Sequence, residues 1–161
     1  MKISTLFFVT LVVLVGLLSN TLAVTWSKNF AKADINTLNP LLNTMQRDFS
    51  SKNYAGIWDL LGDNGTKKLV NNVFGETTQV RSKQEFINAF RQYEQYGQLT
   101  FTIKSAQLKS SSSASHYHMV LNGSIKLNFP IAIVFSADVT FAGKKPQVGK
   151  VSAVTFTINT A

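Results

Sequence analysis

The chain of 161 residues contains no cysteine, so disulfide bonds, thiol chemistry and thiolate metal sites are excluded. Acidic residues are also scarce: 8 Asp and Glu stand against 16 Lys and Arg, giving a net charge of +8. The basic residues are scattered, with small pairs such as Lys67-Lys68 and no dense basic stripe. This distribution favours solubility and weak attraction to anionic surfaces, and we predict no nucleic-acid partner.

The first 23 residues have the features of an export signal. Lys2 supplies a positive start, residues 6–18 are almost purely apolar, and small residues end the segment at Ala23. The apolar run is shorter than the roughly 20 residues that span a bilayer. We therefore predict a signal peptide over residues 1–23, a secreted protein, and no integral membrane segment after cleavage. Without Lys2, the only charged residue removed, the net charge falls from +8 to +7.

Two acceptor sequences for N-glycosylation are present. Asn64 begins Asn-Gly-Thr and Asn122 begins Asn-Gly-Ser, and neither has proline in the middle position. Asn64 lies in a polar segment that we expect to be a loop, so it is the favoured glycosylation site. For Asn122 the sequence leaves occupancy open.

Residues 24–35 show no firm periodicity and are predicted to be an N-terminal arm ahead of a single domain over residues 36–161. Asn39 and Pro40 then indicate a helix start, with Asn39 as the N-cap and Pro40 in the first helical position. The apolar stripe of this first helix is Leu41, Leu42, Met45 and Phe49.

A second helix is expected from Asn53 to the stop at Gly62. Residues 67–74 and 77–81 then flank Gly75 and predict a short hairpin.

The third helix has the clearest start signal. Ser82 and Glu85 have the spacing of a capping box, and Gly97 ends the segment. Its apolar stripe is Phe86, Ile87, Phe90 and Tyr93.

From residue 99 onward the apolar residues alternate, which predicts strands. The parity of the first strand changes between Ile103 and Ala106, so we expect a bulge there. Residues 110–115 are rich in serine and predict a flexible loop.

Residues 116–129 pose a choice, because Asn122-Gly123 between apolar runs is a strong hairpin signal. A two-residue turn there would pair Leu121 with Ser124 and would mix the apolar and polar faces. We therefore predict one long strand that bends near Gly123.

Two further strands follow, over residues 131–141 and 151–158, with a bulge expected in the second. The elements together predict an α+β fold in which three N-terminal helices pack on a curved, mostly antiparallel sheet. That sheet is built from the short hairpin and four long strands. Its broad apolar face needs cover, and the helices are the available cover.

The segment 79–90, Gln-Val-Arg-Ser-Lys-Gln-Glu-Phe-Ile-Asn-Ala-Phe, resembles the passage from hairpin to third helix in the nuclear transport factor 2-like superfamily, also called SnoaL-like or cystatin-like. The element order over residues 36–158 is similar to that superfamily as well. The resemblance implies a cone-shaped domain, open at one end, that holds a small apolar ligand, serves as an enzyme pocket or is filled. Fold alone does not choose among these.

The superfamily's enzymes place carboxylates, Tyr or His inside the cone, and no such pattern matches this chain residue by residue. We therefore name no catalytic residue. Tyrosines on apolar stripes would offer a ligand polar hydroxyls, whereas a surface role is favoured for Asp59. The candidates for a ligand pocket are Tyr54, Trp58, Asp59, Phe90, Tyr93, Tyr117 and Met119.

His116 and His118 project from one face of a strand, as two ligands of a shared metal would. The sequence shows no evident third ligand on a neighbouring element, so no metal site and no cofactor are predicted.

Three hypotheses remain open. The favoured one is a secreted, non-catalytic domain that binds a small apolar ligand or a partner. The alternatives are a cone-pocket enzyme of the isomerase or dehydratase type and a basic surface-interaction protein with a filled core. The outer sheet face is also a candidate surface for a homodimer, which the sequence does not decide.

Overall fold

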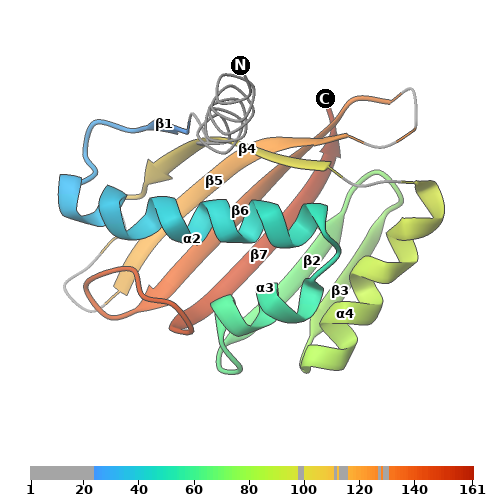
Figure 1. Ribbon diagram of the computed structural model, residues 1–161, viewed down its shortest axis with the longest axis horizontal. Helices are drawn as coiled ribbons and strands as arrows, with labels where there is room; N and C mark the ends of the chain where they lie inside the picture. The colour runs from blue at the N-terminus through green and yellow to red at the C-terminus, as the bar shows by residue number, and fades with distance from the viewer. Residues whose placement is uncertain (1–23, 98–99, 111, 113–115, 127, 129–130) are drawn as a thin grey trace, which may run out of the picture.

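The computed structural model describes residues 24–97, 100–110, 112, 116–126, 128 and 131–161 (Figure 1). Within these residues, three α-helices and one 3-10 helix accompany a seven-stranded sheet, which confirms the α+β prediction. Helix α2 lies across the long strands, and α3 and α4 lie beside it towards β2 and β3. The predicted signal peptide and most of the serine-rich loop lie outside the described residues.

The sheet is mostly antiparallel and has the order β1-β4-β5-β6-β7-β2-β3 in the described part of the chain. Strands β4 to β7 form consecutive antiparallel pairs, whereas β1 joins β4 and β2 joins β7 in parallel. The hairpin β2–β3 therefore extends the sheet beside the last strand. The bounds are β1 Thr25–Trp26, β2 Thr66–Asn71, β3 Glu76–Val80, β4 Thr100–Leu108, β5 His116–Lys126, β6 Ile133–Ala142 and β7 Val151–Thr160.

Helix ends follow local capping chemistry. The Asn53 side chain accepts a hydrogen bond from the Gly56 amide at the start of α3, and the Ser82 hydroxyl accepts one from Glu85 at the start of α4. Gly62 ends α3 with a φ of 88°. No helix in the described ranges is long and apolar enough to cross a membrane. The bounds are α2 Lys32–Ser50, α3 Tyr54–Leu61, α4 Lys83–Arg91 and η1 Gln92–Tyr96.

The prediction that the first helix starts at Asn39 is wrong. Helix α2 already begins at Lys32 and contains Pro40 in its interior. Proline removes the hydrogen bond to the carbonyl four residues earlier, that of Asn36. Both residues are exposed, so water can hydrate that carbonyl. Leu38, fully buried, extends the apolar stripe towards the N-terminus and offsets the local penalty.

Residues 24–35 are part of the fold, whereas the sequence suggested an arm. Strand β1 pairs with β4, and the Ser27 amide donates to the Ala106 carbonyl at 3.0 Å. The Ser27 hydroxyl in turn accepts from the Leu108 amide at 3.1 Å. Phe30 is buried in the core. These contacts give no periodic signal, so the sequence pattern did not indicate them.

Asn122 and Gly123 lie within β5, which confirms the prediction of one strand. A Cβ at Gly123 would overlap the carbonyl oxygen of Thr102 and lie 2.6 Å from the Phe135 ring. Glycine at this position therefore permits the close approach of β4 and an aromatic ring. The predicted bulge is also present, between Ile103 and Ser105.

Candidate ligand-binding cavity

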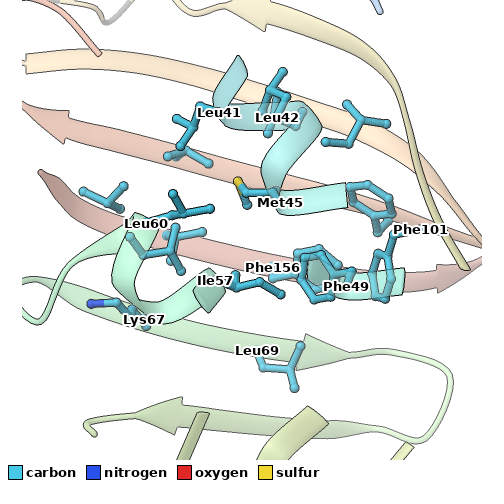
Figure 2. A pocket seen from close by; sticks show the side chains of 18 of the residues that line it. Leu41, Leu42, Met45, Phe49, Ile57, Leu60, Lys67, Leu69, Phe101 and Phe156 are labelled. Atoms are coloured by element: carbon cyan, nitrogen blue, oxygen red, sulfur yellow. The ribbon is translucent and has the colours of Figure 1, made fainter. Parts of the chain in front are cut away.

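A cavity of about 70 Å³ lies between the inner sheet face and helices α2 and α3 (Figure 2). Its walls are almost entirely apolar, and its volume exceeds the roughly 10–15 Å³ that one water occupies by the same measure. Apolar cavities of this kind stay dry and bind small apolar molecules. Leu41, Leu42, Met45, Ile57, Leu60 and Leu69 are among its lining residues.

Aromatic rings form one end of the cavity. Phe49 of α2 stacks on Phe101 of β4 with ring centres 4.0 Å apart, and Phe156 of β7 stacks on Phe135 at 5.1 Å. Figure 2 shows Phe49, Phe101 and Phe156 close together on one side. Stacked rings leave a rigid apolar wall, because aromatic side chains have few rotatable bonds and pack in preferred geometries.

A lysine forms the opposite end. Lys67 of β2 is only 2% exposed, and its nitrogen lies at the side of the cavity away from Phe49 and Phe156 (Figure 2). The ammonium donates a hydrogen bond to the backbone oxygen of Asn64 at 2.9 Å. It also lies 4.3 Å from the centre of the Trp58 ring, within the range of a cation–π interaction.

Burial lowers the pKa of Lys67, and the nearby Asp63 carboxylate opposes that shift. The exposed Asp63 side chain accepts a hydrogen bond from the Trp58 ring nitrogen at 2.5 Å. The Trp58 indole thus donates a hydrogen bond to Asp63 at its edge, and its face contacts the buried Lys67 ammonium. The arrangement places one cationic group at the end of an apolar space.

The amide of Gln46 also borders the cavity, but its oxygen is engaged. Gln46 Oε1 accepts a hydrogen bond from the Ile103 amide at 3.2 Å. Ile103 precedes the β4 bulge, where the ladder to β5 is interrupted. Gln46 therefore has a structural role in attaching α2 to the sheet.

No family model and no curated protein sequence matches the chain. Solved structures do match. An NTF2-like protein of unknown function from Pseudomonas putida KT2440 has a TM-score of 0.58 at 10% identity, over 80% of this chain and 89% of that one. Nuclear transport factor 2 from Cryptosporidium parvum has a TM-score of 0.53 at 14% identity, over 83% and 100%. The chain has the nuclear transport factor 2-like fold.

A third structure with this fold is an NTF2-like protein with a cystatin-like fold from Novosphingobium aromaticivorans. Its TM-score is 0.52 at 12% identity, over 78% of this chain and 81% of that one. At such low identities the likeness shows the NTF2-like fold and does not assign a function.

Two of the seven candidate pocket residues, Phe90 and Met119, line the cavity of this NTF2-like domain. Trp58 is buried just outside the lining and touches it through Lys67. Tyr54 is also buried outside the lining, and its ring stacks on Phe90 with centres 5.6 Å apart. Burial and the Glu94 carboxylate raise the pKa of Tyr54 to about 12.

The other two candidate tyrosines, Tyr93 and Tyr117, lie in the core away from the lining. The Tyr93 hydroxyl accepts a hydrogen bond from the buried Asn71 side chain at 2.9 Å. Burial raises the pKa of Tyr117, and the Asp34 carboxylate adds to the shift. Within the described part of the chain, the hydroxyls of Tyr54 and Tyr117 are buried without a hydrogen bond of standard geometry.

Asp59 lies on the surface. The Lys83 ammonium donates to both of its carboxylate oxygens, at 2.7 and 2.9 Å, and the Asp59 side chain is 63% exposed. It does not belong to the cavity lining. The pairing holds α3 against the start of α4.

The acceptor sequences for glycosylation occupy different surroundings. Asn64 is exposed in the loop between α3 and β2, whereas Asn122 is half-buried in the middle of β5, opposite Ser105 and Ser136.

Of the two histidines, His118 has its ring nitrogen 2.6 Å from Asp138. The described residues contain no group of three or more acids or histidines arranged to hold a metal.

Lys67 is the functional candidate that sequence analysis missed. Strand β2 alternates so that Lys67, Leu69 and Asn71 face inward and Lys68 faces water. The same alternation is visible in the sequence, but sequence analysis considered Lys67 and Lys68 only as one pair of the scattered basic residues. Had the inward alternation of Lys67, Leu69 and Asn71 been given more weight than the charge of Lys67, the sequence would have predicted that Lys67 faces the core.

Proposed function

We propose that the chain is a secreted, non-catalytic NTF2-like domain that binds a small apolar ligand in the cavity between α2, α3 and the sheet. The apolar lining of that cavity is the observation that carries the proposal. Transfer of an apolar molecule from water into such a space is favourable because it removes apolar surface from water.

The lining also suggests a route of entry. Met45 of α2 and Leu60 of α3 border the cavity and are half-buried, so the lining reaches the surface between these helices. Methionine is flexible and adapts to irregular shapes. A ligand that enters here displaces side chains and leaves the sheet intact.

Secretion rests on the composition of residues 1–23. A positive start, an apolar run and a small-residue end are the features that export machinery recognises. The cysteine-free core is compatible with an oxidising compartment, since no thiol is present to oxidise.

Binding is favoured over catalysis by the polar groups at the cavity. The polar residues in its lining are Gln46, Lys67 and Lys68, and the Lys68 side chain faces water. Asp59, the carboxylate considered for an enzyme, instead pairs with Lys83 on the surface. An isomerase or dehydratase mechanism needs a positioned acid or base at the reacting carbon, whereas the Lys67 ammonium is engaged by the Asn64 carbonyl and the Trp58 ring.

The test is a pair of valine substitutions on β6. Ala137 lines the cavity and Ala142 is exposed on the same strand. Calorimetry should detect octanol binding to the wild-type protein. We expect Ala137→Val to weaken that binding at least about tenfold, because the added methyl groups occupy the cavity.

The matched control, Ala142→Val, should bind octanol like the wild type. Failure of the wild type to bind octanol, or equal binding by Ala137→Val, would contradict the proposal. Native mass spectrometry of the protein secreted from different hosts adds a second readout, since a retained small molecule is expected.

A further inference from the structure

We infer that the ligand is a single-chain carboxylate whose head group pairs with the Lys67 ammonium and whose hydrocarbon chain extends towards Phe49 and Phe101. This inference rests on the proposed function, because it names the chemical class of the ligand for the same cavity. It follows from the two different ends of that cavity (Figure 2).

The position of Lys67 gives the first argument. Lys67 lines the cavity, and its ammonium lies at the end away from Phe49 and Phe156 (Figure 2). A ligand that fills the apolar space therefore brings its terminal group to a cation. Short hydrocarbon chains fit a volume of about 70 Å³, which lies well below the roughly 300–1,000 Å³ of pockets for larger ligands.

The contacts of the ammonium give the second argument. An ammonium has three N–H donors, and the hydrogen bond found among the described residues uses one, on the Asn64 carbonyl. The charge also faces the Trp58 ring. A carboxylate oxygen would accept a further donor and form a charge-assisted hydrogen bond.

Charge balance gives the third argument. Within the described part of the chain, the ion pairs are Arg47–Asp48, Lys52–Glu94, Lys83–Asp59 and His118–Asp138, and they do not include Lys67. Asp63 is nearby, but it is exposed and accepts from Trp58. A buried charge is unfavourable unless it is paired, so an anionic head group would stabilise this end of the cavity.

A purely structural lysine is the competing explanation. Its stem would cover the Trp58 ring and its ammonium would tie down the loop at Asn64, with no ligand involved. The two explanations differ in one measurable property. Only a ligand-binding lysine makes the protein prefer a carboxylate over a neutral molecule of the same chain length.

The experiment compares octanoate with octanol by calorimetry at pH 7. We expect the wild type to bind octanoate about tenfold to a hundredfold more tightly, as a hydrogen bond between charged groups would give. Lys67→Met should abolish that preference while still binding octanol, and Lys67→Arg should keep part of it. Lys104→Met, an exposed lysine on β4, is the matched control and should behave like the wild type.

Each outcome decides something. Equal binding of octanoate and octanol by the wild type, or a preference that survives in Lys67→Met, overturns the assignment of Lys67 and leaves cavity binding intact. Binding of neither molecule removes the proposed function as well. If Lys67→Met does not fold, the wild-type comparison and Lys67→Arg still give the answer.

Discussion

The Lys67 ammonium lies 4.3 Å from the centre of the Trp58 ring, and the edge of that ring donates to Asp63. A buried base and a solvated acid therefore contact the same indole. The chain contains one other tryptophan, Trp26, so a Trp26→Phe protein would report on this cluster through its fluorescence alone. The cluster joins the surface loop after α3 to the end of the cavity.

The pH dependence of stability should reflect Lys67. Its pKa is lowered in the folded protein, so between that pKa and the ordinary value of 10.5 the unfolded chain binds more protons. The contribution of Lys67 to the free energy of unfolding therefore rises with pH in this window. In urea unfolding between pH 7 and 10, we expect the free energy of unfolding of Lys67→Met to rise less with pH than that of the wild type. An equal slope in both proteins would show that Lys67 does not cause the rise. Lys104→Met, with its exposed side chain, should keep the wild-type slope.

Tyr54 should produce the opposite trend at higher pH. Its pKa is raised from 10.0 to about 12, so the unfolded chain loses its proton first and stability falls as pH rises from 10 to 12. A pKa difference of two units changes the contribution of Tyr54 to the free energy of unfolding by roughly 3 kcal/mol across this pH range. Tyr54→Phe should lose less stability in alkaline urea unfolding. At pH 7 it should be as stable as the wild type or more so, because the Tyr54 hydroxyl makes no hydrogen bond of standard geometry.

Tyr93→Phe is the matched control for that prediction. It removes a hydroxyl that accepts from Asn71, so it should destabilise the protein by about 1–2 kcal/mol at pH 7. If Tyr54→Phe were destabilised as much as Tyr93→Phe, the hydroxyl of Tyr54 would have a hydrogen-bond partner in solution, which would contradict this prediction.

Elements with strong local chemistry were predictable from the sequence. Ser82 and Glu85 specify the start of α4 by direct capping, and parity across Asn122-Gly123 excluded a turn. Pro40 was misleading, because its preference for the first helical turn was outweighed by buried Leu38 upstream. Strand β1 was missed because two residues give no period.

The candidate site was only partly predictable. Phe90 and Met119 follow from apolar stripes, so their place in the cavity wall was accessible to sequence analysis. The void depends on how side chains of α2 and α3 meet the sheet, which no linear pattern records. Lysine side chains are usually exposed, so burial of Lys67 could be predicted only by giving the alternation of inward and outward residues in β2 more weight than that tendency.

Gly123 should be intolerant of a side chain. Gly123→Ala should reduce the free energy of unfolding by roughly 1–3 kcal/mol, since the added methyl group overlaps the Thr102 carbonyl and the Phe135 ring. Ser124→Ala, a half-buried neighbour on the opposite strand face, should change stability by no more than about 0.5 kcal/mol. Equal urea midpoints for the two variants would show that β4 and β5 are less closely packed than described.

Passage through a eukaryotic secretory pathway should leave two marks on the protein. Its first residue should be Val24, and Asn64 should carry a glycan because it is exposed, whereas Asn122 is half-buried in a strand. N-terminal sequencing and intact mass would show both. Asn64→Gln should remove the glycan mass and Asn122→Gln should not; retention of residues 1–23 or a glycan on Asn122 alone would contradict this account.

The most direct test of cavity binding uses methionine. The predicted cleavage at Ala23 would leave two of the three methionines, Met45 and Met119, and both line the cavity. Methyl NMR of ¹³C-methionine-labelled protein titrated with octanoate should therefore shift both resonances and show nuclear Overhauser contacts between the methionine methyl groups and the ligand chain. Binding detected by calorimetry with both methyl resonances unmoved would place the ligand elsewhere and contradict the account.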